Sequence, residues 1–338
     1  MAVNSLVCAF SLGQQSAIDT VATDFITALA TVSGLQPRFD VTESRQEHPG
    51  GAGTRATSKR APSTRTGYLV DAKCTFVLRP RFIGHALLTN GFTVATTGAG
   101  PYTHVFKLAT RATFPWMTGL WLLPDDDVAS FRLLSSNVRG TSLNINATTS
   151  EVQCDTSLVG MTEGDAAGTE TLVSETTVEI LPTIGSMTIA GVTITKAKTL
   201  NLAIANTIKE DQRYLFEAAR TDLPQESVAV TGTIGGAPLT RDVYRQIFRG
   251  GTSGTEPSLT PLTGNMVYAF ESSSDIPTFG VPYSLTIDLN SVEFSISDNS
   301  LQANNADEIE PEINFEMIDD VTDPIVITLV NDVASYAA

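Results

Sequence analysis

The chain has 338 residues, enough for one large domain or two domains of ordinary size. Only 17% of its residues are charged, against the ~25% usual for a globular chain, and the formal net charge is −16. This composition is typical of a β-rich protein with a largely uncharged surface, and it argues against a class that binds nucleic acid through a basic surface.

The negative charge is concentrated in the C-terminal part of the chain. From residue 251 onward there are fifteen acidic residues and no Lys or Arg, whereas the first 250 residues hold all 21 basic residues and the other 22 acidic ones. Such asymmetry predicts a surface that repels polyanions or docks a basic partner. A solvated acidic region without a partner is the alternative.

In chain order, residues 1–40 fit two patterns. Apolar residues at helical spacing compete with a high threonine content that favours strands, and we expect extended structure. Residues 43–66 follow as a glycine- and proline-containing loop without an apolar period. Loops of this length are usually functional or disordered, and this one carries five basic residues: Arg45, Arg55, Lys59, Arg60 and Arg65.

A strand followed by a short helix is predicted twice. In Gly67–Asn90, apolar residues alternate from Tyr68 to Leu78, and Phe82, Ile83, Ala86 and Leu87 then take helical spacing. Ser227–Gly251 repeats the order, with a helix over Val243–Phe248 that ends at Gly250. The residue identities differ between the two stretches. The recurrence of the order therefore predicts a duplicated β module.

Many short strands separated by turn residues complete the pattern. Further strands are predicted at Thr103–Leu108, Thr141–Thr149, Gln153–Val159, Thr171–Leu181, Val192–Thr195, Thr199–Ala205, Met266–Glu271, Ser284–Leu289, Ser291–Ser297, Ile313–Ile318 and Ile325–Val330, and one more helix at Gln212–Ala219. This spacing indicates sandwiches or barrels. We predict a mainly β fold with two similar β-sandwich or barrel modules, residues 1–165 and 166–338, each with one short helix.

The sequence offers no recognisable catalytic, cofactor or metal site. The three histidines are scattered, no nucleophile elbow or phosphate-binding glycine loop is present, and the three cysteines have no metal-ligand spacing. The run Asp125–Asp127 lacks the spaced ligands of a calcium loop. We therefore expect no enzyme activity, no cofactor and no metal. No secretory signal or membrane-spanning stretch is predicted, so we expect synthesis in the cytoplasm.

The stretch from Arg79 to Leu88 resembles the major tail tube proteins of long, non-contractile-tailed bacteriophages. A strand ends in Pro-Arg, a short helix with a Leu-Leu pair follows, and a strand starts at Tyr102. A glycine-containing linker near Gly50 and the closing strand Ile325–Leu329 fit the same order of elements. We expect no separate decoration domain at the C-terminus, because the last strands are needed for the second module, and this departs from the family's pattern.

The resemblance implies a structural virion protein whose β modules join side by side into rings, which stack into a hollow tube for DNA. Two modules in one chain imply a trimeric, pseudo-hexameric ring, with a hexamer as the alternative. The implied partners are further copies of the chain, a tape measure protein, and tail terminator and initiator proteins. DNA would pass without specific binding, no membrane would be involved, and the protein would belong to the virion after assembly in the host cytoplasm.

Two sets of residues are predicted to carry this function. Because acidic and uncharged walls do not hold phosphates, we expect Asp288 and Glu293 to face the channel. The five basic residues of the loop are expected to contact an acidic surface of the next ring, formed by Asp307, Glu308, Glu310, Glu312, Asp319 and Asp320. Single exposed ion pairs contribute only ~0–1 kcal/mol, so several would act together.

Two other readings stay open. One is another virion component built on the same module, such as a decoration or baseplate protein. The other is a carbohydrate-binding β-sandwich, for which the sequence offers only Trp116 and Trp121, both in apolar surroundings.

Overall fold

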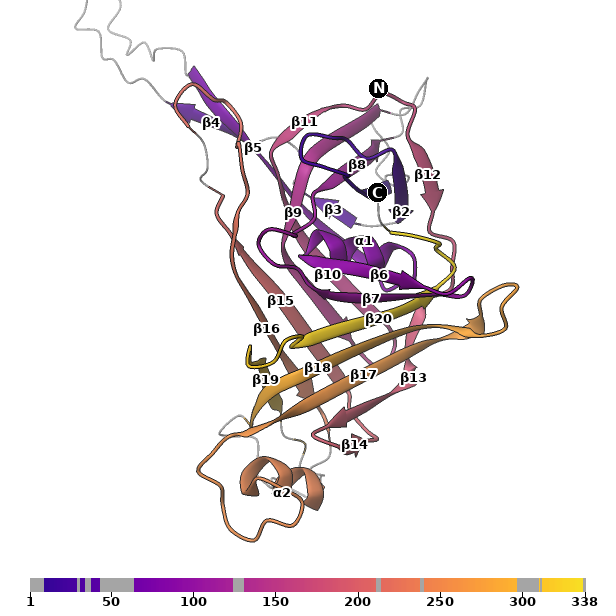
Figure 1. The fold of residues 1–338 in the computed structure, drawn as a ribbon, viewed down its shortest axis with the longest axis vertical. Coiled ribbons are helices and arrows are strands. Elements are labelled where there is room, and N and C mark those ends of the chain that lie inside the picture. The colour runs from indigo at the N-terminus through magenta and orange to yellow at the C-terminus, as the bar shows by residue number, and fades with distance from the viewer. Residues whose placement is uncertain are drawn as a thin grey trace, which may run out of the picture.

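The computed structural model describes residues 9–28, 31–33, 38–42, 64–123, 131–210, 214–237, 240–296, 310 and 312–336, and for residues 31–33, 38–42, 64–66, 123 and 131 it describes the backbone alone. The fold is mainly β and is dominated by a large curled sheet (Figure 1). The strands of the first part are β1 (Ala9–Gln14), β2 (Asp24–Ala28), β3 (Thr31–Ser33), β4 (Arg38–Thr42), β5 (Thr64–Val77), β6 (Phe92–Thr97), β7 (Tyr102–Leu108), β8 (Met117–Leu123), β9 (Phe131–Ala147), β10 (Val152–Gly160), β11 (Thr162–Asp165) and β12 (Thr171–Ser174). Those of the second part are β13 (Ile180–Ile189), β14 (Val192–Ile194), β15 (Thr199–Ile208), β16 (Gln225–Gly235), β17 (Leu262–Asp275), β18 (Pro282–Ile296), β19 (Ile313–Met317) and β20 (Ile325–Asn331).

Eight strands of the first part correspond to eight of the second in their pairing. In the first, β1 pairs with β2 and β8, β9 pairs with β8, β10 and β11, and β5 pairs with β10 and β3, all antiparallel. In the second, β13 pairs with β14 and β17, β18 pairs with β17, β19 and β20, and β16 pairs with β19 and β15, again all antiparallel. The same seven pairings therefore recur in the same chain order.

The two described helices follow corresponding strands. Helix α1 (Phe82–Thr89) comes after β5 and helix α2 (Arg241–Arg249) comes after β16. All eight residues of α1 are buried, because its sequence is apolar on every side. In α2 only Val243 and Ile247, one turn apart, are buried. The strand–helix order predicted twice from the sequence is thus present in the structure.

Local chemistry sets the ends of α2. The Thr240 hydroxyl accepts a hydrogen bond from the Val243 N–H, which satisfies one of the donors left free at a helix start. Gly250 ends the helix at φ 68°, a left-handed conformation that glycine adopts without steric cost.

The two halves share one sheet and one core. Strand β9 pairs with β15, with Ser142 opposite Ala205 at one end and Ala147 opposite Leu200 at the other. Strand β20 pairs with β7, which belongs to the extra hairpin β6–β7. One hydrophobic cluster contains Ile145 of the first half and Leu202 of the second. The first strand set ends at Asp165 and the second begins at Ile180. The predicted division at 165/166 lies in this interval, and two separate modules stay a prediction.

Three local predictions differ from the structure. The helix at Gln212–Ala219 is wrong for its described residues, 214–219, which form turns and bends. The strands predicted at Ser284–Leu289 and Ser291–Ser297 are a single strand, β18, carried through a bulge in which Ser291 and Val292 are both buried. The stretch Thr171–Leu181 contains two strands, β12 and the start of β13, with a break between them.

Candidate functional site

One outward face of the sheet is polar and continuous across both halves. It lies on β5, β10, β9, β15, β16, β19 and the end of β18, where alternate side chains point away from the core. One row of paired residues crosses all seven strands: Thr75, Asp155, Asn144, Ala203, Thr231, Glu316 and Glu293. The next row contains Val77, Gln153, Asn146, Asn201, Thr233, Asn314 and Ser295. We call these two rows the polar face.

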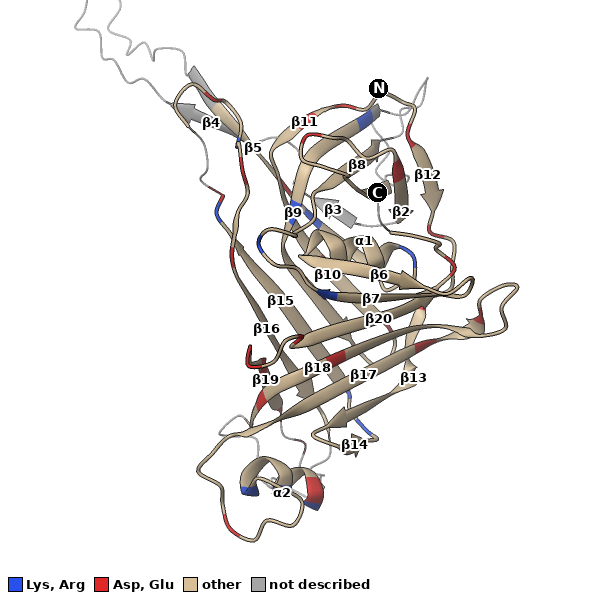
Figure 2. Ribbon diagram, viewed as in Figure 1, with Lys and Arg blue, Asp and Glu red and all other residues tan. Residues whose placement is uncertain are grey.

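The polar face carries few charges. Its fourteen residues include three acids and no Lys or Arg. Figure 2 shows the same sparseness along the strands, where most coloured segments lie at strand ends and in connections. The surface is therefore hydrophilic through amides and hydroxyls, and weakly negative.

Side-chain hydrogen bonds cross the join between the halves on this face. The Asn201 amide donates to the Asn146 Oδ1 at 2.5 Å, and the Asn146 amide donates to the Asp155 Oδ2 at 3.4 Å. The Thr75 hydroxyl donates to the other oxygen of Asp155 at 2.5 Å. These contacts link β15, β9, β10 and β5, so the join between β9 and β15 is part of one ordered surface.

Two carboxylates face each other at the end of the polar face. Glu293 on β18 lies directly opposite Glu316 on β19, and both side chains are exposed. They border a groove of about 340 Å³ that Asn201, Thr231 and Asn314 also line. Like charges directly opposite each other destabilise a sheet, so this pair lowers stability while making the surface negative.

Asp288, the other predicted channel residue, lies elsewhere on β18. Its neighbours across the sheet are Val267 and Val326, and burial raises the pKa of its carboxyl. Its Oδ1 is buried and has no hydrogen-bond partner within the described part of the chain. Glu293 is therefore part of the polar face, whereas Asp288 lies outside its two rows, on the same outward side of β18.

The predicted inter-ring residues fall partly outside the described residues. Arg45, Arg55, Lys59, Arg60, Asp307 and Glu308 lie outside them, and the side chain of Arg65 on β5 is not described. Glu310 accepts from the Lys198 ammonium at 2.5 Å, so it has a partner within its own chain. Glu312, Asp319 and Asp320 are exposed. Their contact with the basic loop stays a prediction.

The two described histidines are packing residues. His85 lies in α1 with its ring edge-on to Tyr336 at 5.2 Å, and burial lowers its pKa to about 3. His104 lies between Thr96, 2.8 Å from its Nδ1, and Asn331, 2.9 Å from its Nε2. Burial also lowers the pKa of His104. Within the described residues no three His, Cys, Asp or Glu side chains gather as a metal site, and no helix is long and apolar enough to cross a membrane.

Sequence reasoning missed two further groups of residues. Glu175 is buried and accepts hydrogen bonds from the Arg81 and Phe82 N–H groups, both at 2.8 Å, at the start of α1. Glu316 and Asp155 belong to the polar face beside Glu293. The alternation along their strands predicts that both side chains point outward. Which residues lie beside them depends on strand pairing, and the local sequence pattern does not show the pairing.

Compared with known protein families the sequence matches none, and no curated protein has a similar sequence.

Proposed function

We propose that this chain is a structural virion protein that polymerises into stacked rings, forming a hollow phage tail tube through which genomic DNA passes. The observation that carries the proposal is the polar face, which runs unbroken across two halves with the same strand topology. A wall of amides and hydroxyls with a weak negative charge suits a channel for a polyanion. Its two rows offer phosphates no cation, and the adjoining row adds only Lys73 on β5, so passing DNA would release few counterions and would not be held.

The join between β9 and β15 supports a way for copies to associate. By the topological correspondence, β3 takes the place of β15 and β18 takes the place of β9. The same join between two copies would therefore set β3 of one copy beside β18 of the next. The edge of β18 that corresponds to the β15-facing edge of β9 is partly covered, because the start of β17 pairs with it as far as Phe294, opposite Leu262. The contact with the next copy would therefore begin at Ser295.

Repeating this join closes a ring. Each copy supplies two equivalent modules, and a heterologous contact closes when its rotation permits. Three copies then give a pseudo-sixfold ring, with a hexamer as the alternative. Pairing strand edges between copies also covers edges that would otherwise promote aggregation.

The loop at residues 43–66 supplies a direct test of assembly. The chain without Gly50–Ser63 should stay folded and fail to form tubes, because the basic residues of this loop are assigned to the contact between rings. Negative-stain electron microscopy and pelleting would compare it with the intact chain, and circular dichroism would check its fold. Undiminished tubes would remove the loop from the proposal, whereas closed caps or single rings from the intact chain would favour a decoration or baseplate protein.

A further inference from the structure

The connection between β15 and β16 presents three consecutive apolar side chains to solvent. Tyr214, Leu215 and Phe216 are 63%, 84% and 105% exposed. A turn closed by the Glu217 N–H and the Tyr214 carbonyl, 3.2 Å apart, sets them at a corner, with Phe216 at φ 78°. A bulky residue in this left-handed region is strained. Exposure and strain together indicate a surface made for a contact, and we call residues 214–217 the tip.

The tip stands on a rigid base. Arg220 is 2% exposed and donates to the Glu210 carbonyl at 2.9 Å and the Glu210 carboxylate at 3.0 Å. It also bonds Asp71 of β5 at 3.3 Å, and the Ala218 carbonyl accepts from the Tyr68 N–H at 2.9 Å. These contacts hold the residues that follow the tip against β5, which reduces the conformational freedom that a contact would cost.

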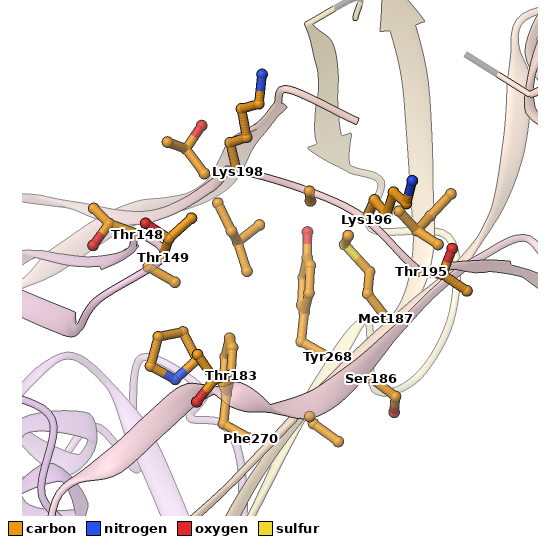
Figure 3. A pocket seen from close by; sticks show the side chains of 18 residues that line it. Thr148, Thr149, Thr183, Ser186, Met187, Thr195, Lys196, Lys198, Tyr268 and Phe270 are labelled. Atoms are coloured by element: carbon orange, nitrogen blue, oxygen red, sulfur yellow. The ribbon is translucent and has the colours of Figure 1, made fainter. Parts of the chain in front are cut away.

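A cavity of about 310 Å³ opens at the other end of β15. Met187, Tyr268 and Phe270 line it with apolar surface (Figure 3), and Leu200 lines it as well. Lys196 and Lys198 extend from its rim (Figure 3). The cavity borders the residues that start β15, whereas the tip follows the residues that end it. The two features thus lie a strand apart, roughly 30 Å for ten residues.

We propose that the tip of one copy inserts into this cavity of a second copy stacked on it head to tail. Two different surfaces at opposite ends of one strand form a heterologous contact, which repeats without limit and builds a stack. The inference rests on the proposed function and assigns it one contact between rings.

The charges of the two surfaces match. Glu217 is exposed next to Phe216, and Lys196 is exposed at the cavity rim. Neither takes part in an ion pair among the described side chains. Docking would bring the two together while the aromatic ring of Phe216 leaves water, and the buried ring supplies most of the affinity.

Assembly of variants tests the contact. Phe216→Gly removes the ring and relieves the strained φ, so it should keep or raise the melting temperature while raising the concentration needed for tubes about tenfold or more. Phe216→Tyr is the matched control and should assemble as the intact chain does. Glu217→Lys and Lys196→Glu should each weaken assembly, and the double variant should restore it. Normal assembly of Phe216→Gly, or no rescue by the double variant, would overturn the contact.

Disulfide trapping separates this inference from the proposed function. The chain carrying Phe216→Cys and Thr183→Cys, with Cys8→Ser as background, should give a ladder of cross-linked copies on a non-reducing gel, and each single variant should give none. A ladder without tubes would keep the tip contact and overturn the tube. Tubes without a ladder would overturn the tip contact and keep the tube.

Discussion

At the scale of single residues, His85 ties stability to pH. Its pKa is lowered to about 3 by burial, and its Nδ1 has no hydrogen-bond partner among the described residues. In the unfolded chain the same imidazole takes a proton near pH 6.5. Because the unfolded state then binds more protons, stability is full above pH 6.5 and falls by up to about 1.4 kcal/mol per pH unit below it, until the folded pKa is reached.

His85→Gln should remove this dependence, since the amide does not titrate. Between pH 7.5 and pH 5.0 the intact chain should lose about 2 kcal/mol more unfolding free energy than the variant, from a window of roughly 1.5 pH units. Urea unfolding at the two pH values measures the difference. The carboxylate of Asp332, whose pKa is lowered by its hydrogen bond from Arg81, loses stability only at lower pH and does not enter this window. Equal losses in both proteins would contradict the assignment.

The pair Glu293–Glu316 gives a second test at this scale. Glu316→Gln removes a like-charge neighbour in the sheet and should raise the unfolding free energy by about 0.2–1 kcal/mol at low salt, with less gain at high salt. Glu312→Gln, an exposed acid outside a strand, is the matched control and should change little. Denaturation at two salt concentrations measures both variants. A destabilised Glu316→Gln would show that the carboxylate makes a favourable contact instead.

At the scale of elements, α1 depends on a carboxylate from the connection between β12 and β13. One oxygen of Glu175 accepts the Arg81 and Phe82 N–H groups, and the other accepts the Thr177 N–H at 3.1 Å. A negative charge at this end of a helix is favourable, and buried N–H groups need acceptors. The start of the helix therefore takes the acceptor for two N–H groups from the segment after β12.

Glu175→Gln should lower the unfolding free energy by about 1–3 kcal/mol, because its NH₂ group turns a donor toward a donor. Glu226→Gln is the control, since Glu226 is exposed on β16 and its change should stay within about 0.5 kcal/mol. Chemical denaturation of the two variants supplies both numbers. No difference between them would mean that Glu175 does not support α1.

Much of the order of elements follows from the sequence, because alternation and helical spacing are local signals. In the predicted strand Thr141–Thr149, the alternate residues Leu143, Ile145 and Ala147 are buried. The predicted helix Gln212–Ala219 is wrong for its described residues, 214–219, which form turns and bends, and Arg220 after them bonds Asp71 of β5. Among the residues of the polar face, only Glu293 is predicted from the sequence to face the channel. The other members of this face meet through pairings such as β9 with β15, which join residues far apart in sequence.

At the scale of the whole molecule, the duplicated topology explains several features together. The recurring seven pairings place corresponding strands in both halves, and the intramolecular join shows one way in which such halves meet edge to edge. The extra hairpin β6–β7 and strand β4 occur in the first half alone (Figure 1). The two halves therefore supply the same seven strand pairings with different attachments.

The most direct measurement is a cryo-electron microscopy reconstruction of the assembled protein. We predict a hollow tube of stacked rings with three copies in each ring, and with Asn144, Thr231, Glu293 and Glu316 facing the channel. A closed particle, or a tube whose channel is lined by another face while the polar face lies between copies, would contradict it.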